Sequence, residues 1–106
     1  MLQKAKLPVE LKDKSLFRQQ CYIDGAWVDA DDKSTLAVHN PASGDPVGTV
    51  PKMGATETRR AIEAAHAAWP AWRAKTAKER ANILRKWFEL MMANQEDLAK
   101  LMTVEQ

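Results

Sequence analysis

Cysteine is almost absent from this sequence of 106 residues, which contains only Cys21. A single thiol cannot form an intramolecular disulfide, so a small secreted scaffold held together by disulfides is excluded. The sequence also lacks an apolar run of the roughly 18 residues that a membrane span needs. Residues 1–8 lack the apolar stretch of a secretion signal. These missing signals predict a cytoplasmic protein without a membrane partner.

A strong excess of one charge is also missing. The 16 Lys and Arg residues are nearly balanced by 14 Asp and Glu residues, which leaves a net charge of +2. The basic residues of the second half are interleaved with acidic ones at helical spacings, as on an ordinary exposed helix face. With 45% hydrophobic and 28% charged residues, the composition favours a folded chain over a disordered one. We therefore expect no nucleic-acid partner.

Sequence motifs for phosphates and metals are missing too. Gly44 and Gly48 fit neither of the glycine-rich patterns that bind nucleotide phosphates. His39 and His66 are far apart and have no second His or Cys at ligand spacing, so no zinc site is expected. The acidic residues at positions 29, 31 and 32 lack the Gly and Glu of a calcium-binding loop, and they predict a solvated turn.

Cys21 is the remaining candidate nucleophile. It lies beside Tyr22 in a β-prone run, without a neighbouring histidine that would activate the thiol. We therefore interpret Cys21 as a small packed hydrophobe. The residues by themselves predict no catalytic group and no cofactor-binding group in this chain.

Turn-forming residues divide the first half of the chain into two β-hairpins. Cys21–Ile23 and Ala26–Val28 are β-prone and flank Asp24-Gly25. This dipeptide is favoured in type I′ turns, because both central positions need a positive φ. A second strand pair is predicted over residues 36–39 and 47–50, joined by a connection rich in turn formers, and Pro51 is expected to stop the last strand.

The second half shows helical spacing of apolar residues. We predict a first helix with Gly54 as N-cap and Glu57 at its third position, although Thr56 is a competing start, and with Pro70 as its end. Thr76 and Glu79 form a capping box that opens a second helix. Asn94 followed by Asp97 predicts the start of a third. The predicted fold class is therefore α+β, with two β-hairpins followed by three helices.

The order of several short motifs resembles the opening of the aldehyde dehydrogenase superfamily. Each motif is common alone, but the ordered series covers roughly residues 16–106. Residues 16–20 together with 50–54 are similar to the succinate- and glutarate-semialdehyde dehydrogenases. The motifs are Tyr22-Ile23-Asp24-Gly25-Ala26-Trp27-Val28, Asn40-Pro41-Ala42-Ser43-Gly44-Asp45, Gly48-Thr49-Val50-Pro51, Trp69-Pro70-Ala71-Trp72-Arg73 and Lys78-Glu79-Arg80-Ala81.

The resemblance implies a position in a longer enzyme. Residues 1–15 would be a flexible N-terminal arm, and residues 16–106 the N-terminal segment of an α/β NAD(P)-binding domain. The implied enzyme is a cytoplasmic homo-oligomer that uses NAD or NADP to oxidise succinate semialdehyde to succinate, with glutarate semialdehyde as the alternative substrate. In the family, the nucleophilic cysteine, the general base and the cofactor-binding turn come later than Gln106. The resemblance thus implies no catalytic and no cofactor-binding residue here.

One site residue set is implied by the resemblance. Some family members hold a monovalent cation between backbone carbonyls before the Asn-Pro turn and an acidic side chain at the end of the third helix. The matching positions are Val38, His39 and Glu105. The family more often has Asp at the last position.

Two other hypotheses remain open. The chain could be a free-standing module that binds a partner through its amphipathic helices, without enzymatic activity. It could instead be a remnant without independent activity. The sequence stops at Glu105-Gln106 without a turn or a helix breaker where the family continues, which favours a piece of a longer protein.

We predict that the isolated chain has no aldehyde dehydrogenase activity and no measurable affinity for NAD or NADP. The reason is that it lacks both a nucleophile–base pair and a glycine-rich phosphate turn. Activity is measured as NAD(P)H production with succinate semialdehyde, and binding by calorimetry. Turnover that the Cys21→Ala variant abolishes, or saturable binding at micromolar concentration, would contradict the prediction.

Overall fold

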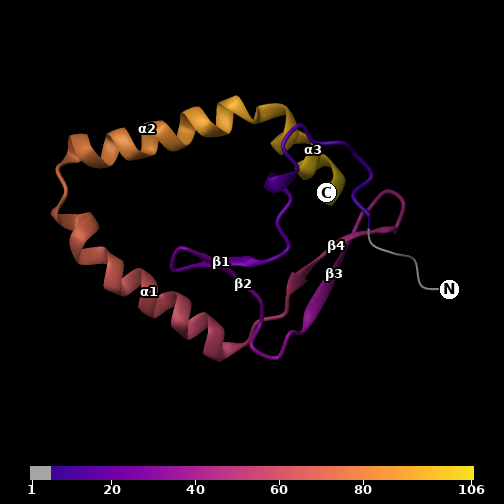
Figure 1. Ribbon diagram of the computed structural model, residues 1–106, viewed down its shortest axis with the longest axis horizontal. Helices are drawn as coiled ribbons and strands as arrows, with labels where there is room; N and C mark the ends of the chain where they lie inside the picture. The colour runs from indigo at the N-terminus through magenta and orange to yellow at the C-terminus, as the bar shows by residue number, and fades with distance from the viewer. Residues whose placement is uncertain (1–5) are drawn as a thin grey trace.

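The computed structural model describes residues 6–106, and it contains two separate two-stranded antiparallel sheets followed by three helices (Figure 1). This arrangement confirms the predicted fold class. No helix among the described residues is long and apolar enough to cross a membrane. The elements are a 3-10 turn η1 (Lys14–Leu16), strands β1 (Cys21–Ile23), β2 (Ala26–Val28), β3 (Thr35–His39) and β4 (Pro46–Pro51), and helices α1 (Ala55–Ala74), α2 (Ala77–Ala93) and α3 (Gln95–Glu105).

The first hairpin forms as its turn residues predict. Asp24 and Gly25 both have positive φ, 50° and 77°, as a type I′ turn requires. One side of the hairpin carries a stack of side chains: the Arg18 guanidinium lies 4.5 Å from the Trp27 ring centroid, and the Trp27 and Tyr22 centroids are 5.1 Å apart. The geometry of the stack favours both a cation–π and an aromatic contact.

The second hairpin is slightly longer than predicted. Strand β3 begins at Thr35, which pairs with Pro51, so this proline is the last residue of β4 rather than the one after it. A proline is tolerated there because β4 has a free edge and needs no further donor. The register shifts between Val38 and His39, which pair with Gly48 and Pro46 respectively. This irregularity is a β-bulge that leaves Val47 without an opposite residue.

Helix α1 begins where the sequence predicts and ends later. Gly54 is the N-cap, and its N–H donates to the Glu57 carboxylate at 3.2 Å. The predicted end at Pro70 is wrong, because the helix continues through Pro70 to Ala74. Pro70 lies about one turn from the end and removes a single N–H donor, the one that would bond His66. The residues after Pro70 keep their own N–H groups and extend the helix by that last turn.

The other two helices begin at the predicted residues, but their caps differ. In α2 the capping box is confirmed: Glu79 N–H donates to Thr76 Oγ1 at 3.1 Å, and Thr76 N–H donates to Glu79 Oε2 at 3.0 Å. At α3, Asn94 is the N-cap but makes no side-chain cap bond, and its amide donates to the Leu90 carbonyl of α2. Asp97 does not cap α3 either. Its carboxylate accepts hydrogen bonds from the N-terminal segment instead.

The described part of the N-terminal segment lies against β4 and α3. Residues 1–5 of the arm expected over residues 1–15 are outside the described residues, and the flexibility of the arm stays a prediction. From residue 6 onward, Lys6 N–H donates to the Pro46 carbonyl at 3.1 Å, and Leu11 is buried. At the end of this segment, Gln19 Oε1 accepts the Thr49 N–H at 2.9 Å.

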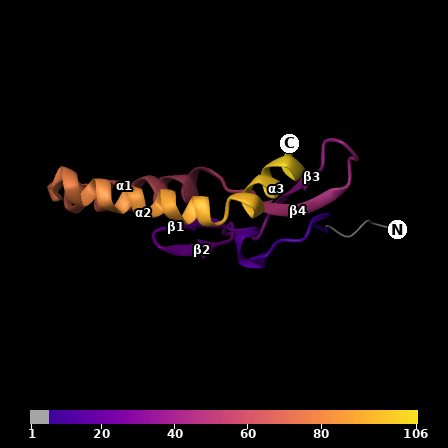
Figure 2. The same ribbon diagram turned by 90° about the horizontal axis from the view of Figure 1, so that it is seen from above.

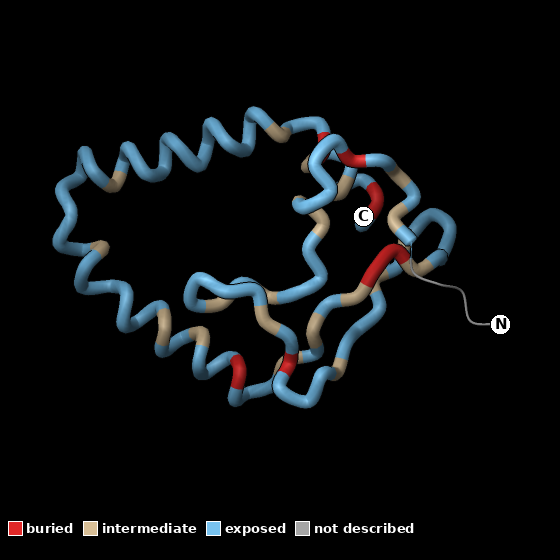
Figure 3. The backbone as a smooth tube through the Cα atoms, in the orientation of Figure 1, coloured by how far each residue is buried: buried red, intermediate tan, exposed pale blue. Residues whose placement is uncertain are grey.

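The described chain has very little core. Only four apolar side chains of residues 6–106 are buried, those of Leu11, Ala30, Val47 and Val104 (Figure 3). The molecule is flat, with extents of 55 × 35 × 19 Å, and α1 and α2 diverge from their junction without packing on each other (Figures 1 and 2). Its radius of gyration is 17.0 Å, whereas a compact domain of this length has about 13 Å.

The missing core appears as apolar surface on the helices. The accessible surface is 8608 Å², against about 6,000 Å² for a compact monomer of this mass. Ile62 of α1 and Trp87 of α2 are 63% and 61% exposed. The apolar residues at helical spacing are therefore largely exposed on these two helices. The other large exposed apolar side chains on these two helices are Trp69, Ile83, Leu84, Phe88, Leu90, Met91 and Met92.

We predict that the isolated chain is poorly stable or self-associates. At about 25 cal/mol per Å², leaving about 400 Å² of apolar surface in water forgoes about 10 kcal/mol, comparable to the stability of a whole domain. Two-stranded sheets are marginal in water and do not compensate. Sedimentation and thermal melts measure the outcome. A monodisperse monomer with a sharp cooperative transition would favour the free-standing module instead.

Candidate functional site

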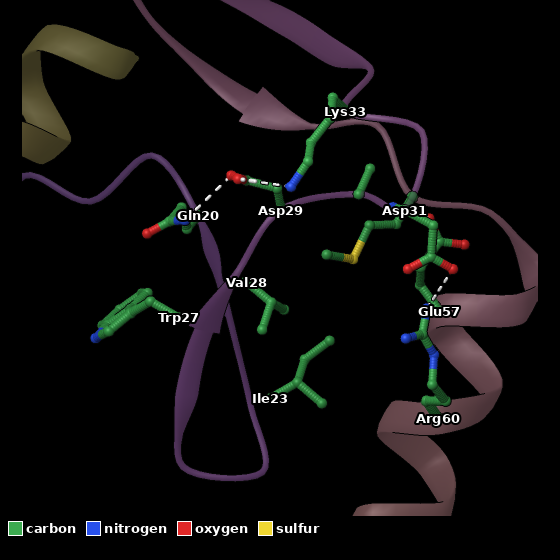
Figure 4. A pocket seen from close by; sticks show the side chains of 11 residues that line it. Gln20, Ile23, Trp27, Val28, Asp29, Asp31, Lys33, Glu57 and Arg60 are labelled. Carbon is green, nitrogen blue, oxygen red and sulfur yellow. Dashed lines mark hydrogen bonds and ion pairs between the residues drawn. The ribbon is translucent and has the colours of Figure 1, made fainter.

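A cavity of about 470 Å³ lies between the first hairpin and the start of α1 (Figure 4). Its walls come from β1, β2, the turn after β2 and the first two turns of α1. Figure 4 shows Asp31, Glu57 and Arg60 on the side of α1 and the Asp29–Lys33 pair above the end of the hairpin. Ile23, Val28 and Trp27 come from the hairpin. The acidic residues come from the turn after β2, and Glu57 and Arg60 come from the first two turns of α1.

The charges around this cavity pair with one another. Arg60 forms a hydrogen-bonded ion pair with Asp31, and this hydrogen bond raises the pKa of the Arg60 guanidinium. Glu57, which caps α1 through Oε1, accepts the Asp31 N–H through Oε2 at 3.3 Å. Asp29 accepts from Gln20 at 3.1 Å and lies 3.6 Å from Lys33 Nζ. The two contacts of Asp31 fasten the turn after β2 to α1.

The acidic turn after β2 is a turn, as predicted, and its carboxylates have partners in the chain. Asp32 accepts the Ser34 N–H at 2.9 Å, and this bond lowers the pKa of Asp32. Among the described residues, no three His, Cys, Asp or Glu side chains are grouped so that they could hold a metal ion. The carboxylates of this cavity are thus engaged in hydrogen bonds and ion pairs within the chain.

The isolated cysteine and histidines lie in different places. Cys21 is half-buried on β1, opposite Val28, so it packs less completely than a core residue. His66 is exposed on α1, and His39 is exposed at the end of β3. Cys21, His39 and His66 thus lie on three different elements, β1, β3 and α1.

Two of the three residues expected at a cation site do share a cavity. Val38 and Glu105 both line a small space of about 20 Å³ beside Gly48 and Phe17, which is room for about one water-sized species. His39 is not among the residues that line it. Arg18 also lines this space, and its guanidinium would compete with a cation for the Glu105 carboxylate. Cation binding there stays a prediction.

A dinucleotide does not fit the helix N-termini of this chain. The pyrophosphate of such a cofactor binds where free N–H groups at a helix N-terminus meet a glycine-rich turn. At α1 and α2 that position is taken by the chain's own carboxylates, Glu57 and Glu79. The first turn of α3 carries Glu96 and Asp97. A second anion at any of these ends would be repelled.

Asp97 is the residue whose role the sequence did not show. The residue is 4% exposed, and its carboxylate accepts the N–H groups of Lys12 at 3.0 Å and Asp13 at 2.9 Å. The Asp13 and then the Lys12 backbone hydrogen bond lower the pKa of Asp97. The stability from this contact is therefore present above the ordinary value of 3.8 and is lost as pH falls through the lowered one. No local signal distinguishes Asp97 from its exposed neighbour Glu96.

Comparisons with known proteins give one consistent result. Residues 27–106 match the model of the aldehyde dehydrogenase family. Over 98 residues the chain is 69% identical to a glutarate-semialdehyde dehydrogenase of Pseudomonas aeruginosa and 62% identical to an NADP(+) succinate-semialdehyde dehydrogenase of Escherichia coli. Each alignment covers 92% of this chain and 20% of the relative, so the chain spans about a fifth of the length of these relatives.

Solved structures agree with these matches. An NADP-dependent enzyme of E. coli superposes with a TM-score of 0.90 at 63% identity, and a succinate-semialdehyde dehydrogenase of Burkholderia pseudomallei with 0.90 at 60%. Both superpositions cover 92% of this chain and 20% of the other one. The fold described above is accordingly that of an N-terminal part of these larger structures.

We predict that a monovalent cation stabilises the protein through Glu105. If Na⁺ or K⁺ binds near Val38 and Glu105, exchanging choline chloride for KCl at equal ionic strength raises the stability by about 1 kcal/mol at a cation concentration several times the dissociation constant. The Glu105→Gln variant should lose this response, whereas the control Glu96→Gln should keep it. Thermal melts in the two salts measure the difference, and an equal response in all three proteins would contradict cation binding at this position.

Proposed function

This chain belongs to the aldehyde dehydrogenase family, and from this membership we propose that it forms the N-terminal part of the nucleotide-binding domain of an NAD(P)-dependent semialdehyde dehydrogenase. The proposed reaction is the oxidation of succinate semialdehyde to succinate, with glutarate semialdehyde as the second candidate substrate. We place the enzyme in the cytoplasm as a homo-oligomer, in keeping with the sequence resemblance.

The observation that supports this substrate class is what the similar proteins have in common. Glutarate-semialdehyde dehydrogenases are 69% and 66% identical to this chain, and a succinate-semialdehyde dehydrogenase is 62% identical. A 3-sulfolactaldehyde dehydrogenase is 57% identical. All three named substrates are short aldehydes with an anionic group at the far end. The shared chemistry supports an anionic aldehyde as substrate.

The second candidate substrate has its own support. The two relatives with the highest identities among those named above act on glutarate semialdehyde according to their names. Glutarate semialdehyde has one methylene more than succinate semialdehyde, and such a difference is worth only about 1–3 kcal/mol in an apolar pocket. Sequence identity over this segment therefore supports the class of anionic aldehydes more strongly than it supports either of the two semialdehydes.

The chain's own contribution is structural. Its helix N-termini do not fit the dinucleotide, and the charged groups around the cavity between the first hairpin and α1 pair with one another. Its main surface feature is the set of exposed apolar faces on α1 and α2. Because the matched relatives are about five times longer, we propose that further parts of the protein cover these faces. Family members use NAD(P), and we assign its binding and the chemistry to those further parts.

We predict that the longer protein carrying this segment prefers anionic aldehydes. A clamp of charged hydrogen bonds on the far carboxylate is worth roughly 1.5–3 kcal/mol, which corresponds to roughly 10–100-fold in kcat/KM. Kinetics of NAD(P)H formation with succinate semialdehyde, glutarate semialdehyde and the uncharged control butanal measure the preference. Equal kcat/KM for butanal and both semialdehydes would refute the proposed substrate class, and a higher value for glutarate semialdehyde would select the second candidate.

A further inference from the structure

The N-terminal segment connects two elements that lie at different ends of the sequence. From residue 6 it passes the beginning of β4, reaches α3 and then turns back toward β1 (Figures 1 and 2). Its first described contact is the hydrogen bond from Lys6 N–H to the Pro46 carbonyl, and its last is the one from Thr49 N–H to Gln19 Oε1. Both of these contacts are with β4. The hydrogen bonds that the segment makes to other elements between these two are with α3.

The contact with α3 is centred on Asp97. Its two carboxylate oxygens accept two successive backbone N–H groups, those of Lys12 and Asp13. Two adjacent N–H groups that point the same way form a concave anion-binding site, and here the anion is a side chain 84 and 85 residues away in the sequence. Asp97 is buried, so the charge depends on these two donors for the hydrogen bonds that water would otherwise supply.

Neighbouring contacts reinforce this one. Lys100, about one turn further along α3, donates through Nζ to the Glu10 carbonyl at 3.1 Å. Between these two polar contacts the Leu11 side chain is buried, at 7% exposure. The remaining charged contact joins Lys12 Nζ and Glu96 at 3.9 Å, and the two side chains are 82% and 79% exposed. Such an exposed ion pair contributes little to stability.

The same segment is held closely against β4. A Cβ atom at Gly48 would come within 2.8 Å of Phe17 Cζ and 3.0 Å of Gln19 Oε1. The segment therefore crosses β4 where the strand has no side chain, and Gln19 then bonds the next residue, Thr49. Since α3 and the β3–β4 hairpin are both fastened to residues 6–19, movement of this segment affects both.

We propose that residues 6–19 form a strap that couples α3 to the β3–β4 hairpin, and that Asp97 is the latch that closes it. Opening of the latch frees the Lys12 and Asp13 N–H groups and loosens the contact between Gln19 and Thr49. The strap thereby sets the position of α3, including Glu105 at its end, relative to β4. The groups that face the latch are Glu10, Lys12 and Asp13 of the strap and Glu96 and Lys100 of α3.

Amide hydrogen exchange on the longest natural form of the protein tests the latch. Asp97→Asn replaces one acceptor oxygen by a donor amide, which leaves one of the two N–H groups without a partner. We expect exchange at Lys12 and Asp13 to rise on the order of tenfold or more, with a smaller rise at Thr49. The matched control is Glu96→Gln, which removes only the exposed ion pair and should leave exchange at all three amides within about twofold of the parent.

A second variant keeps the test decisive if Asp97→Asn does not fold. Lys100→Met removes the bond to the Glu10 carbonyl and retains the apolar stem, and it should raise exchange at Lys12 and Asp13 by a smaller factor. Amides in the middle of α2 serve as internal references and should not change. Unchanged exchange at Lys12 and Asp13 in both variants overturns the latch. Raised exchange there with no change at Thr49 overturns the coupling to β4.

Discussion

Hydrogen bonds from backbone N–H groups to two buried carboxylates hold this chain together. Glu57 and Asp97 are the buried charged residues among those described, and each joins segments that are distant in the sequence. Glu57 connects the turn after β2 to the first turn of α1, and Asp97 connects the N-terminal segment to α3. Since only four apolar side chains of residues 6–106 are buried, these polar contacts account for much of what joins distant parts of the described chain.

This dependence on polar contacts explains the open shape. Helices α1 and α2 are each well defined locally, because Glu57 accepts the N-cap N–H of α1, α2 begins with a capping box, and both contain good helix-forming residues. Local stability, however, does not bring helices together, and most of the large apolar side chains that the structure describes on α1 and α2 are exposed. The family membership gives a physical context for such faces, since the matched relatives are about five times longer than this chain.

Local chemistry was predictable from the sequence, and long-range contacts were not. The Asp24-Gly25 turn, the N-cap at Gly54 and the capping box at Thr76 are determined by residues within four positions of one another, and all three are confirmed. The predicted helix end at Pro70 was wrong because one missing donor near a helix end costs less than the remaining turn contributes.

The candidate site shows the same division. The resemblance placed Val38 and Glu105 together, and the structure puts both on one small cavity, but without His39. Spacing in the sequence could not have shown this arrangement, since it depends on the strap and on the bulge in β3–β4. Asp97 was expected to help cap the start of its own helix, α3. Its actual partners are 84 and 85 residues away, and no pattern of neighbouring residues encodes such a contact.

The sequence separation between Asp97 and its partners has a consequence for synthesis on the ribosome. A ribosome adds about 5–20 residues per second, so Lys12 is joined to the chain roughly 4–17 s before Asp97. Both hairpins and α1 can form within microseconds of leaving the exit tunnel, while the N-terminal segment has no carboxylate to bind. During that interval its Lys-rich backbone is open to chaperones and proteases. The closing of the strap therefore marks the moment at which the whole segment, from its first described residues to its last helix, has been made.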